Sequence, residues 1–227
     1  MAIALDDIRP LWQAIKRLHD ETEWPETKQA VAVRVALFDL EQFCQATLIL
    51  LKFGLTSPAM ALERSVYERA NHVLAASVDR KFAHSFVDAD PRIRQKTRTG
   101  AADNVIRKIA DRIGYDTKSI TTAMRDIREF GSLHVHPSAG LPSFMLEEAN
   151  SLGGVQETLD SLIDSLAKMM LLALYQSAMA VHSTSGMTTV VGHAFTTANT
   201  WSVEFGGFSV DDITGGDDSR IAYVDRN

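Results

Sequence analysis

The sequence predicts an all-α protein, a bundle of five or more helices with a small C-terminal β-hairpin extension. Two observations support this fold class. Over most of residues 27–182, apolar residues recur at spacings of three and four, as the buried face of a helix requires. Beyond residue 183 apolar and polar residues alternate, which is typical of strands. We therefore expect a helical bundle domain over residues 1–182 and an extension over residues 183–227.

The first two helices are expected to form an antiparallel hairpin over residues 29–77. The apolar positions of the first of these helices form one stripe: Val33, Leu37, Leu40, Phe43 or Cys44, Thr47 or Leu48, and Leu51. Gly54 is placed to end this helix with a left-handed backbone. Ser57 is expected to cap the next helix, with Pro58 at its first position, where a missing N–H costs nothing.

Further helices are expected along the rest of the helical domain. Residues 79–100 contain Pro91 and a run of charges, which predict a short helix and a loop. An amphipathic helix should follow over residues 101–114, and another over about 118–134. The last helix is expected over about 155–182.

The C-terminal extension contains the stretch WSVEFGGFSVDD. Its two adjacent glycines, 206 and 207, suit a tight hairpin turn. Such a hairpin would place five apolar side chains on one face: Trp201, Val203, Phe205, Phe208 and Val210. We expect this face to pack on the helical body or on a second subunit, because an isolated hairpin is marginally stable.

Composition narrows the class of protein. The chain has 227 residues, of which 45% are hydrophobic and 23% charged, as in an ordinary soluble globular protein. Its formal net charge of -6 argues against a surface that is basic throughout. No export signal is visible, and the longest apolar run, residues 166–181, is interrupted by Lys168 and too short to span a membrane. These features predict a cytoplasmic protein with no membrane contact, in which the lone Cys44 is a buried, inert thiol.

The candidate catalytic residues are Arg128, His134 and His136, at the end of the predicted helix 118–134. A helical hairpin, a late bundle helix and an R-x5-H spacing together resemble HEPN domains (higher eukaryotes and prokaryotes nucleotide-binding). That superfamily includes metal-independent RNases in which the motif is paired across a dimer, and many members without demonstrated activity. The resemblance covers roughly residues 30–182 and implies a homodimer that could act on RNA without a cofactor. Glu129 departs from the small polar residue that often follows the arginine in the RNases, and its charge would weaken phosphate binding.

Two roles are open for these three side chains. In the catalytic role, either histidine would exchange a proton with an RNA 2′-hydroxyl or a leaving 5′-oxygen, and Arg128 would hold the phosphate. The products would carry 2′,3′-cyclic phosphate ends. Arg128 and His134 can converge only if the helix bends, and Gly131 and the approaching Pro137 give a reason for such a bend. In the structural role, Arg128 makes a salt bridge and a histidine caps the helix end.

A polar ridge is expected on the second hairpin helix, because three pairs of its polar residues are i,i+4 neighbours: Arg64 with Glu68, Tyr67 with Asn71, and Glu68 with His72. Facing solvent, the ridge would be an ordinary polar surface. Facing inward, it would be either a site, in which Arg64 and Glu68 position the catalytic pair, or a buried network. The buried network would suit a non-catalytic module that dimerises or binds a partner.

A metal site is not expected. His134 and His136 form an H-x-H pair to which His182, His193 or Glu68 could add a ligand, but this spacing suits adjacent ligands best on a strand. Charge is distributed unevenly, since residues 80–128 contain twelve Lys or Arg against six Asp. This segment, at +6, could guide an RNA backbone toward the R-x5-H motif or form a solvated surface.

Overall fold

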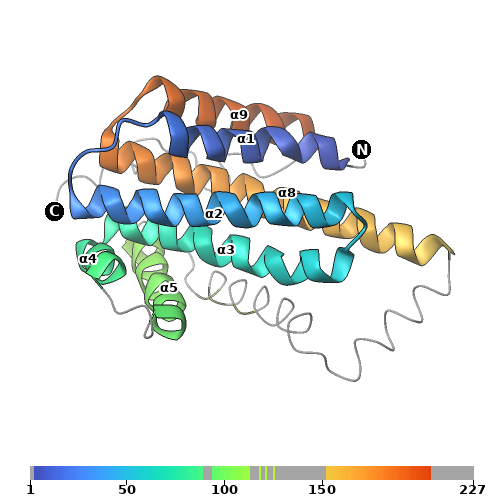
Figure 1. Ribbon diagram of the computed structural model, residues 1–227, viewed down its shortest axis with the longest axis horizontal. Helices are drawn as coiled ribbons and strands as arrows, with labels where there is room; N and C mark the ends of the chain where they lie inside the picture. The colour runs from blue at the N-terminus through green and yellow to red at the C-terminus, as the bar shows by residue number, and fades with distance from the viewer. Residues whose placement is uncertain are drawn as a thin grey trace.

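The computed structural model describes residues 3–88, 94–112 and 152–205, with residues 118, 121 and 125. This part of the chain forms seven helices and no strand (Figure 1), which confirms the all-α class. The helices are α1 (Leu5–Glu21), α2 (Lys28–Lys52), α3 (Thr56–Val78), α4 (Arg80–Asp88), α5 (Arg94–Arg112), α8 (Leu152–Ser185) and α9 (Thr189–Phe205). None of the described helices combines the length and apolar character of a membrane span.

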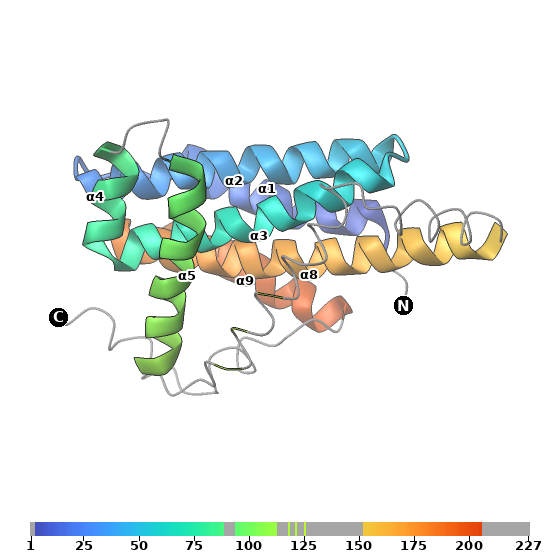
Figure 2. The same ribbon diagram turned by 90° about the horizontal axis from the view of Figure 1, so that it is seen from below.

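The helices are arranged around α8. The antiparallel pair α2 and α3 packs on one side of α8, and α1 and α9 lie together on the other side (Figure 1). α5 packs against α3, crosses it, and projects away from the bundle (Figure 2). The inward faces share one hydrophobic core, whose largest fully buried side chains include Ile8, Leu11, Ile15, Leu18, Leu37, Leu40, Leu166, Met170, Leu171 and Leu174.

The hairpin of α2 and α3 confirms the prediction for residues 29–77. Gly54 has a φ of +70°, in the left-handed region where glycine is favoured. Its N–H donates to the carbonyl of Leu51 at 2.9 Å, and the Leu55 N–H donates to that of Leu50 at 2.9 Å. These two bonds form a Schellman motif, which satisfies carbonyls that the end of α2 would otherwise leave open.

The start of α3 differs from the prediction. Leu55 is the N-cap residue and makes no side-chain cap, so the predicted cap at Ser57 is wrong. Pro58 is the third helical residue rather than the first. The hydrogen bond from the Leu55 N–H to the Leu50 carbonyl holds Leu55 at the end of α2. The next helix therefore begins with the following residue, Thr56. Pro58 is still tolerated, because N–H groups of the first turn have no intrahelical acceptor.

The predicted helices of the middle of the chain are present where the structure describes them. The short helix expected within residues 79–100 is α4, and Asp79 caps it by accepting from the Phe82 N–H at 2.9 Å. The helix expected at 101–114 is part of α5, which begins earlier, at Arg94. The last predicted helix is α8, which is longer at both ends. The expected helix at 118–134 lies outside the described residues except for three helical positions.

The first strand of the predicted hairpin is wrong, because residues 201–205 belong to α9. Trp201 is buried, stacks on Phe205 with ring centroids 4.9 Å apart, and donates from Nε1 to the Asp7 carbonyl at 2.8 Å. Val203, which the hairpin would have buried, is 87% exposed. The alternating stretch therefore continues an apolar stripe of helical spacing that packs on α1 and α8: Val190, Val191, Ala194, Ala198 and Trp201. The expected glycine turn and second strand lie outside the described residues.

Candidate functional site

The described part of the predicted site is the polar ridge of α3. Arg128, His134 and His136, with the expected bend at Gly131 and Pro137, lie outside the described residues. The hypothesis that arginine and histidine converge therefore stays a prediction. The ridge can be placed, because α3 packs against α2, α8, α4 and α5.

The five ridge residues divide into an accessible pair and a buried group. Arg64 and Glu68 form an ion pair, with Nε and Oε1 2.9 Å apart, and their side chains are 27% and 13% exposed. Tyr67, Asn71 and His72 are buried. Spacing along α3 does not decide this division, because Glu68 and His72 are i,i+4 neighbours and only His72 is buried, against the rings of Phe82 and Phe86. Within the ridge, the accessible pair alone is not buried, and its solvent contact is partial.

Asn71 takes part in a polar layer between α3 and α8. Its Oδ1 accepts from Gln176 Nε2 at 3.2 Å, and both residues are buried. Among the described residues, Asn71 Nδ2, Gln176 Oε1 and the hydroxyl of Ser177 have no hydrogen-bond partner. If α3 and α8 paired in a shifted register, the hydrogen bond between Asn71 and Gln176 would be lost, and two more buried polar atoms would have no partner. The polar layer therefore favours one register of the two helices.

His72 contacts an aromatic cluster on α4. The centroid of its imidazole ring lies 6.1 Å from that of Phe82 and 6.0 Å from that of Phe86, both on α4. Such tilted and edge-on contacts stabilise packed rings beyond the area that they bury. His72 therefore helps to fix α4 on α3.

Glu63 was not among the predicted site residues, yet it is the most deeply buried acid on α3, 5% exposed. Its Oε1 accepts a hydrogen bond from the hydroxyl of Ser165 on α8. Burial raises the pKa of the Glu63 carboxyl above its ordinary value, and the bond from Ser165 opposes this rise. The signal was present in the sequence, because positions 63, 67 and 71 are successive i,i+4 neighbours on one side of a helix.

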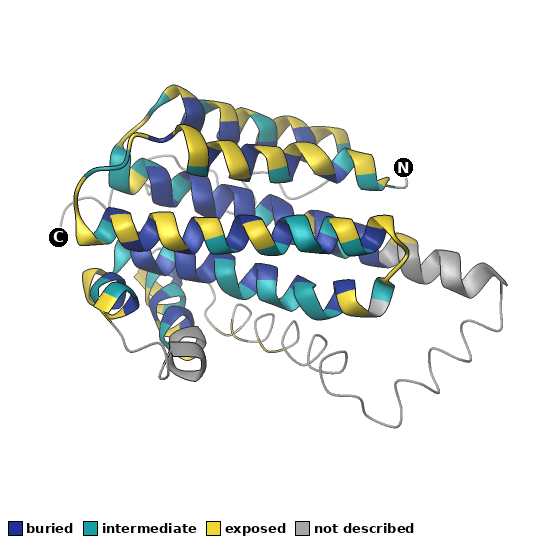
Figure 3. Cartoon of the chain, viewed as in Figure 1, coloured by how far each residue is buried: buried dark blue, intermediate teal, exposed yellow. Residues whose placement is uncertain are grey.

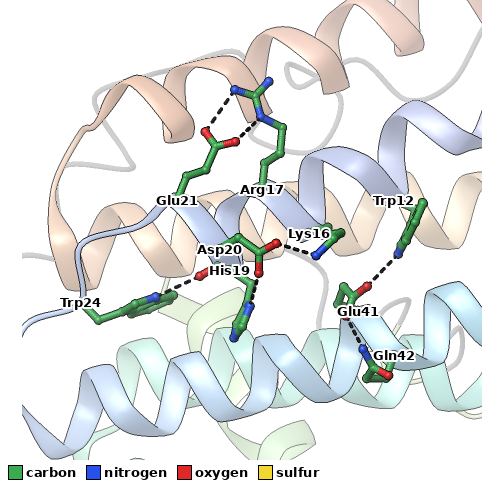
Figure 4. Close-up of polar contacts among 9 residues, drawn as sticks. All are labelled: Trp12, Lys16, Arg17, His19, Asp20, Glu21, Trp24, Glu41 and Gln42. Carbon is green, nitrogen blue, oxygen red and sulfur yellow. Dashed lines mark hydrogen bonds and ion pairs between the residues drawn. The ribbon is translucent and has the colours of Figure 1, made fainter.

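A second buried carboxylate, Glu41, joins α1 to α2 (Figure 4). Trp12 Nε1 donates to its Oε1 at 3.2 Å, and Gln42 Nε2 donates to its Oε2 at 2.6 Å. Unlike Glu63, Glu41 thus has a partner for each oxygen. Neighbouring ion pairs on the surface of α1, such as Arg17 with Glu21 at 2.8 Å, are exposed and contribute little.

Cys44 lies close to Glu41 in the core. The thiol is fully buried, as predicted. Burial, with the nearby charge of Glu41, raises the pKa of Cys44 far above its ordinary value. A thiol in this setting carries almost no thiolate at neutral pH and is therefore a poor nucleophile.

The most basic part of the described chain is α4 with α5. Together they contain eight Lys or Arg against three Asp. Lys108 and Arg112, near the end of α5, are exposed, and α5 projects from the bundle (Figure 2). Part of the predicted excess of positive charge therefore lies on the exposed side of α5, whose other side packs on α3.

Within the described residues no three His, Cys, Asp or Glu side chains are grouped in a way that could hold a metal ion. His134 and His136 lie outside that part of the chain. Comparison with protein-family models finds no match, and no curated protein or solved structure is significantly similar to this chain.

Proposed function

We propose that this chain is a HEPN-like helical protein that cleaves RNA without a metal ion, with Arg128 and His134 as the central pair and His136 assisting. One observation carries the proposal. In a chain of net charge -6, α4 and α5 have eight bases and three acids, and they precede the R-x5-H motif. A projecting basic helix is suited to contact the phosphates of a single strand.

The proposed chemistry is a transfer within the RNA strand. One histidine removes the proton from a 2′-hydroxyl, whose oxygen then forms a bond to the adjacent phosphorus. The bond from phosphorus to the 5′-oxygen breaks, and the other histidine protonates this leaving oxygen. Arg128 donates hydrogen bonds to the non-bridging oxygens as their charge develops. The products are a 2′,3′-cyclic phosphate and a 5′-hydroxyl.

The ridge of α3 would support this site in two ways. The Arg64–Glu68 ion pair remains partly accessible, so it can orient groups that approach α3. Tyr67, Asn71 and His72 are buried and can act only by holding α3 against α8 and α4. Substitution of the pair should therefore change cleavage directly, while substitution of the buried three should first lower stability.

The test uses folded protein and a labelled single-stranded RNA in EDTA. Wild type should cleave, and His134→Ala and Arg128→Ala should each slow cleavage at least about a hundredfold. A Lys108→Glu, Arg112→Glu variant should weaken RNA binding by roughly tenfold at low salt. Its matched control is Lys168→Glu, an exposed lysine on α8, which should bind RNA as wild type does.

Two outcomes would sink the RNase proposal. One is a folded wild type that leaves RNA intact in EDTA. The other is a His134→Ala variant that cleaves at the wild-type rate.

A second function, a non-catalytic helical module that dimerises or binds a partner, is favoured by the burial of the ridge. Four polar residues of α3, namely Glu63, Tyr67, Asn71 and His72, are at most 6% exposed. Under this proposal the layer specifies how the helices pair, and function resides on an outer surface. Folded wild type would then be inactive on RNA but would self-associate or bind a partner, and Lys108→Glu, Arg112→Glu would leave that association unchanged.

A further inference from the structure

α2 has a second apolar stripe, which faces outward. The stripe consists of Val31, Val35, Phe38 and Ile49, with Phe53 at the C-cap position directly after the helix; their exposed fractions are 45, 52, 51, 48 and 73% in chain order. In Figure 3, exposed residues recur along the whole of α2 on the face turned to the viewer. Single exposed apolar residues are ordinary, but a row of them along one helix marks an interaction surface.

The outward stripe of α2 is symmetric in sequence about Gln42. Val31 and Phe53 are each eleven residues from Gln42, and Val35 and Ile49 are each seven residues from it. Phe38 and Ala46 are each four residues away. At 3.6 residues per turn, positions four, seven and eleven residues apart lie on the same side of a helix. The full stripe is about 33 Å long, from the rise of 1.5 Å per residue.

A stripe with this symmetry can pair with itself. When a second α2 lies antiparallel across a two-fold axis at Gln42, Val31 lies opposite Phe53, Val35 opposite Ile49, and Phe38 opposite Ala46. Each small or β-branched side chain then meets a larger apolar one, and the same surface serves both copies, as in an isologous dimer. Parallel pairing would instead place each side chain against its own copy along the stripe.

Charges at the two ends of α2 favour the same orientation. Glu23 and Glu26 are exposed just before α2, and Lys52 is exposed at its last position. None of these three forms an ion pair with another described residue. Lys28, the first residue of α2, is already paired with Asp88. Antiparallel pairing brings Lys52 of each copy toward the end of the other that carries Glu23 and Glu26, whereas parallel pairing would set these acids beside each other.

Gln42 supplies a polar centre. Its Nε2 donates to Glu41 of the same chain at 2.6 Å, which leaves its Oε1 as an acceptor on the exposed face. A single polar residue in an apolar helix seam fixes register, because any slip would bury it against apolar side chains. We propose that α2 forms a two-fold symmetric, antiparallel helix pair with a second copy of this chain, centred on Gln42. This inference assigns a surface to the homodimer that the resemblance to HEPN domains implies, and it does not require that the chain cleave RNA.

The test measures the molar mass of the full chain by light scattering across a range of concentrations. Wild type should be a dimer, and Val35→Glu and Ile49→Glu should each raise the dimer dissociation constant by at least roughly a hundredfold, since every substitution occurs twice in the interface. Val203→Glu is the matched control, because Val203 is exposed on α9. Circular dichroism verifies that all variants are folded.

Cross-linking tests the geometry. Under mild oxidation Gln42→Cys should form a disulfide-linked dimer, since residue 42 lies on the axis and the buried Cys44 cannot react. Met187→Cys, at an exposed position between α8 and α9, should remain unlinked. A monomeric wild type would overturn the proposal, as would a dimer that Val35→Glu leaves intact. So would a dimer that Gln42→Cys fails to link, or a monomer whose stripe binds lipid vesicles.

Discussion

Replacement of Glu63 by glutamine should stabilise the protein at pH 8 and change its stability little near pH 4. Glu63 is 5% exposed, and its Oε2 has no hydrogen-bond partner among the described residues. Burial raises the pKa of its carboxyl above the ordinary value of 4.5. For such a group the favourable contribution to folding is complete below pH 4.5 and is lost as the pH rises through the folded-state pKa.

The size of the effect follows from the surroundings of Glu63. Glutamine keeps the oxygen that accepts from Ser165 and has no charge to desolvate. A buried polar group without a partner lowers the free energy of unfolding by about 1–3 kcal/mol, and by more when it is charged. Replacing the charged carboxylate by the uncharged amide should therefore raise the free energy of unfolding at pH 8 by about 1–2 kcal/mol. In a chain of this size that gain corresponds to a rise of about 2–8 °C in Tm.

Urea unfolding followed by circular dichroism at pH 4, 6 and 8 measures this difference. The gain in unfolding free energy of Glu63→Gln over wild type should grow with pH. Glu23→Gln is the control, because Glu23 is an exposed acid and its replacement should have little effect at any of the three values. A Glu63→Gln variant that is no more stable than wild type at pH 8 would refute the reasoning, as would a gain of the same size at pH 4.

Two further substitutions test contacts that hold the helices in place. Gly54→Ala should lower the free energy of unfolding, measured in urea, by about 1–2 kcal/mol, because φ is +70° there. Beyond its two chain neighbours, no described residue has an atom within 4 Å of an added Cβ, so the cost comes from the backbone conformation; an unchanged urea midpoint would contradict it. Trp201→Phe should lower the free energy of unfolding by about 1–3 kcal/mol, because it removes the N–H that donates to the Asp7 carbonyl at 2.8 Å. In the variant, hydrogen exchange should show that the amides of α9 lose protection before those of α2.

The helical hairpin could be predicted from the sequence because its signals agree with one another. α2 repeats an apolar stripe over 25 residues, and Gly54 marks its end. α1 was missed, although Ile8, Leu11 and Ile15 have helical spacing, because Pro10 interrupts the segment and helix interiors rarely tolerate proline. Burial of α1 against α2, α8 and α9 compensates for the lost hydrogen bond.

The end of α9 could not be predicted correctly from local pattern. The stretch from Trp201 to Phe205 alternates like a strand, but its two aromatic residues are also i,i+4 neighbours on a helix. Contact with α1 decides between the two, because the helical form buries Trp201 and satisfies its N–H at the Asp7 carbonyl. Short apolar runs are ambiguous for this reason, and tertiary contacts settle them.

The orientation of the α3 ridge also required the tertiary structure. Spacings of three and four identify residues that lie near one another, but they are the same whether a ridge faces solvent or a neighbouring helix. Glu63 was overlooked because an isolated acid is expected on a surface. Glu63 lies on the same side of α3 as Tyr67 and Asn71, and the structure shows that this side faces α8. There Ser165 donates to Glu63, and Gln176 donates to Asn71.

The two apolar faces of α2 link the fold to the proposed dimer. The stripe that predicted the helix, including Val33, Leu37 and Leu40, is fully buried in the bundle. The second stripe, out of phase with the first by two residues at Val31 and Val35, is exposed. A helix that is apolar on two faces is normally covered on both, and the bundle covers one. An antiparallel second copy would cover the other face with the same side chains. The residues of this one stripe would therefore be enough to specify the partner.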